Sequence, residues 1–362
     1  MELIVRDKDI ITGECEMEDL HSLSEYPIFM GCVNSKFESD IRVEQTWQIS
    51  KGSGIIQLRK LVPLEILYDK HHNSGAVGST WMDHHHKFSE YILESNPKNV
   101  LEIGGAHGIL AKKCLSKTKI PWTILEPNPH PVEGCDAKFI EGFFDNTFKI
   151  DNKIDTIVHS HVLEHLYDPL QFFKDLAKTN LSTNLIFSLP NLHEMLLRKY
   201  TNCLNFEHTI FITEPLIDYL LSFHGFEIKD KTYYKADHSI FYKCKRTNKS
   251  KIKNLPKDYY QTNKSIFMNY IKHHEILIKE LNYQINHNSS KIFLFGAHIF
   301  SQYLIEFGLN VNKIECILDN DSGKQGKRLY GSKLFVKSPK ILKDINEPLI
   351  ICICFSLKSS NP

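Results

Sequence analysis

The ten residues Asn99-Val-Leu-Glu-Ile-Gly-Gly-Ala-His-Gly108 constrain the fold of this chain more than any other stretch. Their apolar run predicts a short buried parallel strand, and the glycines that follow it precede a helical pattern over residues 109–116. A strand, a glycine turn and a helix together bring backbone amides close to a ligand at a helix N-terminus. We therefore expect a nucleotide-binding loop, and the alternative is a purely structural strand–turn–helix corner.

Two acidic residues indicate what this loop binds. Glu102 lies at the end of the strand, where a carboxylate repels a phosphate and attracts an amine or another cation. Glu126 ends the next expected strand, residues 121–126, roughly 20 residues beyond the loop, where a carboxylate accepts hydrogen bonds from both ribose hydroxyls of an adenosine. Pro127 follows it and is assigned to the same site. Dinucleotide-binding enzymes share the second feature, so it does not separate NAD from S-adenosylmethionine.

Composition excludes several classes of function. A chain of 362 residues with 42% hydrophobic and 24% charged residues is typical of a globular protein with two or three domains. The net charge of +1 gives no footprint for nucleic acid or an anionic membrane, and no apolar run approaches the roughly 20 residues that span a bilayer. The nine scattered cysteines favour a reducing compartment. We expect a cytoplasmic enzyme without nucleic-acid or membrane partners.

The stretch from Ile154 to Pro169, Ile-Asp-Thr-Ile-Val-His-Ser-His-Val-Leu-Glu-His-Leu-Tyr-Asp-Pro, is the most specific motif. Its apolar strand delivers four polar residues to the carboxyl edge of the sheet, where ligands of α/β proteins bind: Ser160, His161, Glu164 and His165. Further strands are expected at 184–190, 226–231 and 239–245, the last two as a hairpin, with a helix from Glu214 closed by Gly225. We therefore expect an α/β fold with a doubly wound sheet.

Together these motifs resemble the class I S-adenosylmethionine-dependent methyltransferases, whose first motif is an acidic residue followed by Gly-x-Gly-x-Gly. Ala106 stands here at the middle glycine. The resemblance implies a Rossmann-like domain with S-adenosylmethionine as its cofactor. It also implies an adenine site in the loop after the third strand, where Phe143 or Phe144 supplies the apolar face and Asp145 accepts from the exocyclic amine. The alternative places both phenylalanines in the core. The implied cofactor residues are Glu102, Gly104, Gly105, Ala106, Gly108, Glu126, Pro127, Phe143, Phe144, Asp145, Ser160 and His161.

Methyl transfer is a direct displacement, so the protein must mainly align the nucleophile and remove its proton. His208 is the best candidate base because histidine titrates near neutrality, and Glu207 beside it can orient it or act as its acid/base partner. His165 is a second candidate. The alternatives are a hydrogen-bonded loop histidine at 208 and a structural helix cap at 165.

Residues 1–90 predict a small α+β module with a helix from about Ser79 to Glu94. Cys15 and Cys32 alone cannot complete a tetrahedral thiolate zinc site. His71, His72, His84, His85 and His86 offer imidazoles, but successive positions of a helix point in different directions. We assign no metal ligands, leave zinc open, and expect some of these histidines to line a substrate cleft.

Residues 251–362 predict a long helix over 260–286 and a second strand–glycine turn–helix from Lys291, with a following strand that ends at Asp319. A single glycine argues against dinucleotide binding, so we expect a docked Rossmann-like unit that helps to hold substrate. The last strand-like run, 350–355, stops short of a finished parallel sheet. We expect this unit to be truncated or to be completed by another surface.

The order of parts, 1–90, 91–250 and 251–362, resembles the sugar C-methyltransferase family, which acts on nucleotide-linked keto-deoxysugars in bacterial antibiotic and surface-polysaccharide pathways. The segments that carry this resemblance are Gly54-Ile-Ile-Gln-Leu, Tyr68 with Asn73-Ser-Gly, His84, Phe206-Glu-His, and Phe295-Gly-Ala with Leu318-Asp-Asn. It implies that Glu207 and His208 handle enolisation of a keto-sugar, with His165 on the substrate side. The expected substrate-binding residues are Tyr68, His72, Asn73, His84, Asn205 and His238.

Two departures from that family leave alternatives open. Only Cys15 and Cys32 lie where the family has four zinc cysteines, and Asn205 stands where it has a tyrosine. The second departure allows O-methylation, because a hydroxyl nucleophile needs only a base. Our leading hypothesis is a monomeric or homodimeric methyltransferase acting on a nucleotide-linked sugar. The alternatives are a sugar O-methyltransferase, an NAD(P)-dependent sugar-nucleotide oxidoreductase and a scaffold that has lost its chemistry.

Overall fold

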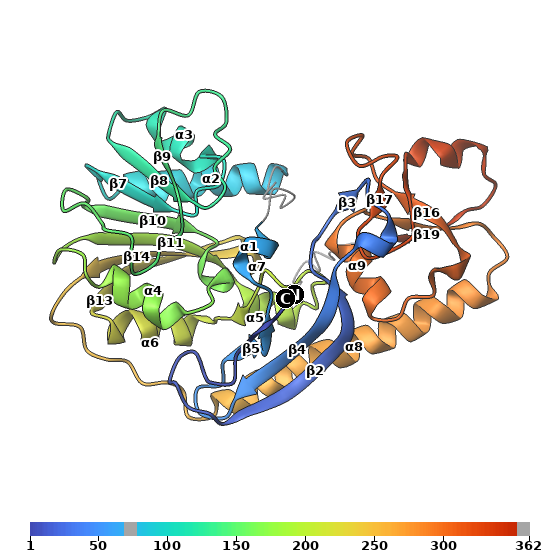
Figure 1. Ribbon diagram of the computed structural model, residues 1–362, viewed down its shortest axis with the longest axis horizontal. Helices are drawn as coiled ribbons and strands as arrows, with labels where there is room; N and C mark the ends of the chain where they lie inside the picture. The colour runs from blue at the N-terminus through green and yellow to red at the C-terminus, as the bar shows by residue number, and fades with distance from the viewer. Residues whose placement is uncertain (69–77, 353–362) are drawn as a thin grey trace, which may run out of the picture. The chain divides into compact units, whose positions relative to one another are not determined.

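The computed structural model describes residues 1–68 and 78–352 (Figure 1). The chain forms two compact units, each assembled from several segments. The first, here called the core unit, comprises residues 1–18, 48–195 and 207–264. The second unit comprises residues 19–47, 196–206 and the chain from 265 onward. The boundaries fall within β2 (Met17–Pro27), β4 (Arg42–Ser50) and α8 (Tyr259–His287). The division into 1–90, 91–250 and 251–362 stays a prediction.

A seven-stranded sheet organises the core unit, in the order β13-β14-β11-β10-β7-β8-β9. All neighbouring pairs from β11 to β9 are parallel, and β14 is antiparallel to both of its neighbours. The strand order reverses between β7 and β10, which is where open α/β sheets bind ligands. This confirms the doubly wound sheet and its terminal hairpin. The strands are β7 (Val100–Ile103), β8 (Trp122–Glu126), β9 (Lys138–Glu141), β10 (Thr156–Ser160), β11 (Asn184–Pro190), β13 (Phe226–Tyr234) and β14 (Ser239–Arg246).

Helices cover both faces of this sheet, as Figure 1 shows. Side chains of α2 (Ser79–Leu93) and α3 (Ile109–Leu115) share one hydrophobic core with Val100 and Trp122. Side chains of α4 (Pro169–Leu176) and α6 (Glu214–Phe223) share the other core with Leu101 and Ile103. Successive residues of β7 therefore face opposite layers, as the pleat of a strand requires. Both faces are buried, which explains why the strands read as continuous apolar runs.

Shorter elements complete the core unit. Strand β1 pairs antiparallel with β6, and β5 pairs antiparallel with β12, which begins two residues after His208. A 3₁₀ helix, η2, follows β10 and carries His165. These elements are β1 (Ile4–Val5), β5 (Ile56–Leu58), β6 (Lys60–Leu61), α1 (Leu64–Leu67), η2 (Leu163–His165), α5 (Leu192–Leu197), β12 (Ile210–Phe211) and α7 (Lys235–His238).

The second unit contains a four-stranded parallel sheet in the order β18-β16-β15-β19. A glycine turn joins β15 to α9, and the Ala297 amide donates to Asp319 Oδ2 at 2.8 Å, at the end of β16. This confirms the second Rossmann-like unit. A two-stranded sheet, β3 with β17, lies in the same unit. The elements are β3 (Cys32–Val33), η1 (Phe37–Ser39), β15 (Ile292–Phe295), α9 (Ile299–Glu306), η3 (Val311–Lys313), β16 (Ile314–Leu318), β17 (Arg328–Leu329), β18 (Val336–Lys337), η4 (Pro339–Asp344) and β19 (Leu349–Cys352).

A search for membrane spans among the described residues finds no helix with the length and apolar character needed to cross a bilayer.

Candidate active site

The glycine loop follows β7 at the carboxyl edge of the sheet. A Cβ on Gly105 would lie 2.7 Å from Ile124 and 2.9 Å from the Glu102 carboxyl carbon, and one on Gly104 would lie 2.8 Å from Val162. Both are closer than atoms can approach, so only glycine leaves this backbone in place. Ala106 has φ +45°, a left-handed backbone that an L residue rarely adopts. The predicted turn is therefore present with Ala106 in it, and its role in binding a cofactor stays a prediction.

Glu126 lies directly beside this loop. Its Oε2 accepts from the Ala106 amide at 2.9 Å, and its Oε1 accepts from the Asn128 amide at 3.2 Å. The first bond helps to hold the left-handed backbone of Ala106, and the carboxylate keeps lone pairs for a ribose because each oxygen accepts two hydrogen bonds. Pro127 is half-buried next to it. The residues present therefore fit the adenosine of S-adenosylmethionine.

Glu102 has surroundings that the sequence did not indicate. The Trp122 indole donates to its Oε2 at 2.7 Å, and the side chain is buried on the α2/α3 side of the sheet. Burial raises the pKa of Glu102 to about 7, since a charged carboxylate loses solvation there. Its role toward an amine-bearing ligand stays a prediction. Trp122 is a partner that sequence reasoning missed, although the two residues share a face of neighbouring strands.

The predicted adenine residues separate into different environments. The Phe144 ring packs on Phe172 and Phe148, with centroids 5.3 and 6.0 Å away, whereas Phe143 is 44% exposed. Asp145 Oδ1 accepts from the amide and hydroxyl of Thr147, and the hydroxyl bond lowers the pKa of Asp145. The core interpretation therefore suits Phe144. The adenine role of Phe143 and Asp145 stays a prediction.

The end of β10 carries the polar network that the Ile154–Pro169 motif predicts. Ser160 Oγ lies 2.7 Å from Ser188 Oγ on β11. His161, with φ +54°, has Nε2 3.0 Å from Ser239 Oγ and Nδ1 3.3 Å from Glu164 Oε1. A left-handed residue directly after a strand turns the chain sharply, and here it places the imidazole between β14 and η2.

Glu164, His165 and His208 form the first of two groups whose donor atoms converge within 4.8 Å of one another. His165 Nε2 lies 3.6 Å from Glu164 Oε1, its Nδ1 lies 3.3 Å from the Tyr68 hydroxyl, and its ring centroid is 5.3 Å from that of His208. The structure therefore brings both predicted base candidates together with Tyr68. Glu164, which the Ile154–Pro169 motif places at the same sheet edge, is fully buried.

Glu207 precedes His208 and has a perturbed acidity. Burial raises the pKa of Glu207 to about 7, so the side chain exchanges a proton near neutral pH. A carboxyl of this kind can act as a proton donor while a neighbouring imidazole acts as base. This matches the acid/base role expected for the pair.

Arg6 holds the segments that carry His165 and His208 side by side, and sequence reasoning missed it. Its guanidinium donates to the carbonyl of Thr209 at 3.0 Å and to those of Leu166 and Tyr167 at 3.3 and 2.9 Å. These carbonyls adjoin His208 and His165. The side chain is buried, and burial lowers the pKa of Arg6 to about 10. A lone arginine in a mixed N-terminal stretch carries no sequence signal for this role.

His84, His161 and His238 form the second converging group, again with one donor atom each within 4.8 Å. They come from α2, the end of β10 and α7, and Trp81 packs against all three rings. Sequence analysis assigned His84 and His238 to substrate binding and His161 to the cofactor, but did not bring them together. His72 and Asn73 lie outside the described residues.

The remaining predicted residues do not form a zinc site of the family type. Among the described residues, the groups able to hold a metal contain histidine and glutamate and no cysteine; Cys15 belongs to the core unit and Cys32 to the second unit. A thiolate zinc site therefore does not fit. Asn205 is buried in the second unit and donates to the Asn202 carbonyl at 3.3 Å.

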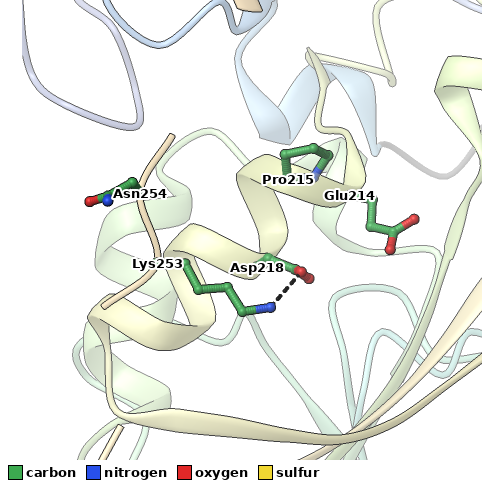
Figure 2. A pocket seen from close by; sticks show the side chains of 5 residues that line it. All are labelled: Glu214, Pro215, Asp218, Lys253 and Asn254. Carbon is green, nitrogen blue, oxygen red and sulfur yellow. Dashed lines mark hydrogen bonds and ion pairs between the residues drawn. The ribbon is translucent and has the colours of Figure 1, made fainter. Parts of the chain in front are cut away.

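Two pockets lie elsewhere on the core unit. Figure 2 shows one of about 250 Å³, in which Lys253 points toward Asp218 and pairs with it at 2.8 Å beside Glu214. The other, of about 330 Å³, is lined mainly by residues 189–194 and 212–215. Neither is lined by the glycine loop or by the two converging groups. The ion pairs around Asp218 are the ordinary stabilising contacts of a charged surface.

Part of the chain is similar to known proteins. Residues 71–231 match the model of a family described as a methyltransferase domain. A comparison with curated proteins found no match. Among solved structures, a mitomycin 7-O-methyltransferase is 17% identical with a TM-score of 0.41, over 48% of this chain and 56% of that one. The match thus spans little more than half of that protein. Magnesium protoporphyrin IX methyltransferase from Synechocystis PCC 6803 is 17% identical with a TM-score of 0.37, over 48% and 90%.

Proposed function

We propose a function for this chain on the premise that residues 71–231 form a methyltransferase domain, for which S-adenosylmethionine is the expected cofactor. The chain transfers a methyl group to a sugar, in the first instance a nucleotide-linked keto-sugar used in bacterial surface-polysaccharide or related glycan synthesis in the cytoplasm. The observation that carries this proposal is the convergence of Tyr68, His165 and His208 with Glu164.

The cofactor-binding part rests on the loop and on Glu126. A Cβ on Gly104, Gly105 or Gly108 would overlap neighbouring side chains at 2.7–2.8 Å, so the turn is closely packed at these positions, and Glu126 lies against it through the Ala106 amide. A cofactor bound there supplies an electrophilic methyl group. His161 and Ser160 at the end of the adjacent strand β10 face the same sheet edge.

The acid/base part rests on Glu207 and His208. His208 removes the proton from the carbon next to the sugar carbonyl, and Glu207, whose pKa burial raises to about 7, donates a proton to the carbonyl oxygen. The carbon atom of the resulting enol then attacks the methyl group. Tyr68 and His165, 3.3 Å apart, provide hydrogen bonds that orient the sugar oxygens. One proton leaves the substrate for each methyl group gained.

A second candidate is O-methylation of a sugar hydroxyl. It is favoured by Asn205, which has no hydroxyl where the sugar C-methyltransferases have a tyrosine. In that reaction His208 removes the hydroxyl proton directly, and no carbonyl is needed. A product in which the new methyl group is bonded to oxygen, shown by NMR, distinguishes this candidate from C-methylation.

Calorimetry of the full chain with S-adenosylhomocysteine, NAD and NADP is the first test. We expect micromolar binding of S-adenosylhomocysteine alone, followed by a mass gain of one methylene when nucleotide-sugars are screened with S-adenosylmethionine. Binding of NAD or NADP alone would favour an oxidoreductase. Binding of none of the three, by protein shown to be folded, would favour a scaffold that has lost its chemistry.

A further inference from the structure

We propose that His84, His161 and His238 form a binding site for a divalent transition-metal ion, with zinc as the best fit. One ring nitrogen from each lies within 4.8 Å of the other two. The three side chains come from α2, the end of β10 and α7, so the tertiary fold brings them together rather than closeness in sequence. The inference needs no sugar substrate, but the group shares His161 with the expected cofactor site and lies beside Glu164 of the other cluster, so the test below reads metal binding alone.

His84 provides the first independent indication of a ligand. Its side chain is fully buried, and neither ring nitrogen has a hydrogen-bond partner among the described residues. A buried polar group without a partner is unfavourable, and nearly all such groups in folded proteins are satisfied. A metal ion bound by one nitrogen removes that cost.

Glu164 provides the second indication. Its Oε1 lies 3.3 Å from Nδ1 of His161, which leaves Nε2 of the same ring facing Ser239 Oγ at 3.0 Å. Histidines that bind metals commonly donate the opposite ring N–H to a carboxylate, which fixes the ring and raises its basicity. The Ser239 hydroxyl also lies 2.6 Å from Nδ1 of His238. The imidazoles of His161 and His238 therefore both contact the Ser239 hydroxyl.

The surroundings keep the three rings in place. Trp81 packs edge-on against His161, His84 and His238, with centroids 4.7, 5.3 and 5.1 Å away. Helix α2 is fixed to the hairpin because the Tyr234 hydroxyl donates to Asp83 at 2.6 Å. This contact holds His84 against α7.

Three imidazoles are a common zinc set and leave a fourth position open. In a tetrahedral zinc site with Zn–N bonds of about 2.0 Å, the ligand nitrogens lie about 3.3 Å apart. Rotation of the half-buried side chains of His161 and His238 brings the three nitrogens to that separation. Imidazole ligands also suit Co²⁺, Ni²⁺ and Cu²⁺, so the site is defined by ligand type rather than by one metal.

The test uses the full chain, stripped with a chelator and then titrated with Zn²⁺ by calorimetry and with Co²⁺ by visible absorption. We expect one equivalent of either metal to bind, and the intense visible absorption typical of tetrahedral Co²⁺. Bound Co²⁺ should quench Trp81 fluorescence, and W81F should remove that part of the quenching. No saturable binding by the folded wild-type chain would overturn the proposal.

Variants locate the ion. We expect H84Q and H238Q each to weaken binding at least 100-fold, and E164Q to weaken it about 10- to 100-fold through the orientation of His161. H86Q is the matched control, because His86 lies on the same helix with a side chain 46% exposed, and it should bind as the wild type does. Thermal melting checks folding, and if H84Q does not fold, the half-buried His238 decides the result.

The other converging group, Glu164 with His165 and His208, provides the competing outcome. Under our proposal H208Q keeps metal binding. Loss of binding in H208Q with retention in H84Q and H238Q would place the ion on that group instead and would refute the assignment.

Discussion

Replacing Glu126 by alanine is expected to weaken the binding of S-adenosylhomocysteine at least 100-fold. The side chain has two connected roles at the loop. It offers its carboxylate to the ribose hydroxyls, and its Oε2 holds the amide of left-handed Ala106 at 2.9 Å. Alanine removes both, leaving the Ala106 backbone without the acceptor that stabilises it.

The magnitude follows from the hydrogen bonds involved. A hydrogen bond to a charged group contributes about 1.5–3 kcal/mol, so two ribose bonds at the lower value contribute about 3 kcal/mol. Each 1.4 kcal/mol corresponds to about tenfold in Kd, which gives roughly 100-fold before any disturbance of the loop is counted. The Kd of E126Q should lie between those of the wild type and E126A. In the wild type both carboxylate oxygens accept from backbone N–H groups, at Ala106 and Asn128, and the glutamine amide nitrogen would face one of these donors instead.

Calorimetry with S-adenosylhomocysteine is the assay, with thermal melting to confirm folding. E141Q is the matched control, because Glu141 is exposed and is the register partner of Glu126 on the neighbouring strand β9. It should bind within about threefold of the wild type. An E126A variant that keeps the wild-type Kd would refute the reasoning. If E141Q weakens binding as much as E126A does, the loss of negative charge in this region, and not the contacts of Glu126, accounts for the weaker binding.

Three further perturbations test the acid/base pair, the buried carboxyl and the second unit. H208A should lower methyl transfer about 100- to 10,000-fold with an unchanged Kd for S-adenosylhomocysteine, because a general base is lost and the cofactor loop is untouched. E102Q should gain stability relative to wild type by about 3 kcal/mol as the pH rises from about 4.5 to 7, because the unfolded wild-type chain loses the Glu102 proton near pH 4.5 whereas the folded chain keeps it up to a pKa of about 7; urea unfolding at pH 5 and pH 8 measures it. R328M should destabilise the fold by about 3–5 kcal/mol, because it leaves the buried Asp40 carboxylate without its bidentate partner.

Each of these has an outcome that contradicts it. Unchanged turnover in H208A removes His208 from the mechanism. A stability difference for E102Q that does not change with pH means that Glu102 does not retain a proton in the fold. For R328M the control is E25Q, whose carboxylate is 71% exposed and 3.9 Å from Arg42, and which should change stability by less than about 0.5 kcal/mol. If R328M and E25Q change the free energy of unfolding equally, the buried Arg328–Asp40 pair contributes no more to stability than an exposed ion pair does.

Several features were predictable because their signals are local in the sequence. The glycine loop, the strands that precede Glu102 and Glu126, and the Ile154–Pro169 motif each occupy one short stretch with its own period or turn chemistry. The hydrogen bond from the Ala106 amide to Glu126 is visible only in the structure, where adjacent parallel strands place their carboxyl ends side by side. Sequence alone therefore determined the doubly wound sheet, the cofactor loop and the second Rossmann-like unit.

Tertiary structure decided which side chains meet across long separations. Arg6 contacts carbonyls 160 to 203 residues away, and the Trp122 indole reaches the buried carboxyl of Glu102. His84 and His238 are distant in sequence and become neighbours of His161 only because α2 packs on the β13–β14 hairpin and Ser239 at the start of β14 contacts His161. No local pattern encodes such meetings, because they depend on the directions of side chains from separately formed elements. Sequence determined the scaffold, and packing determined the polar clusters at its edge.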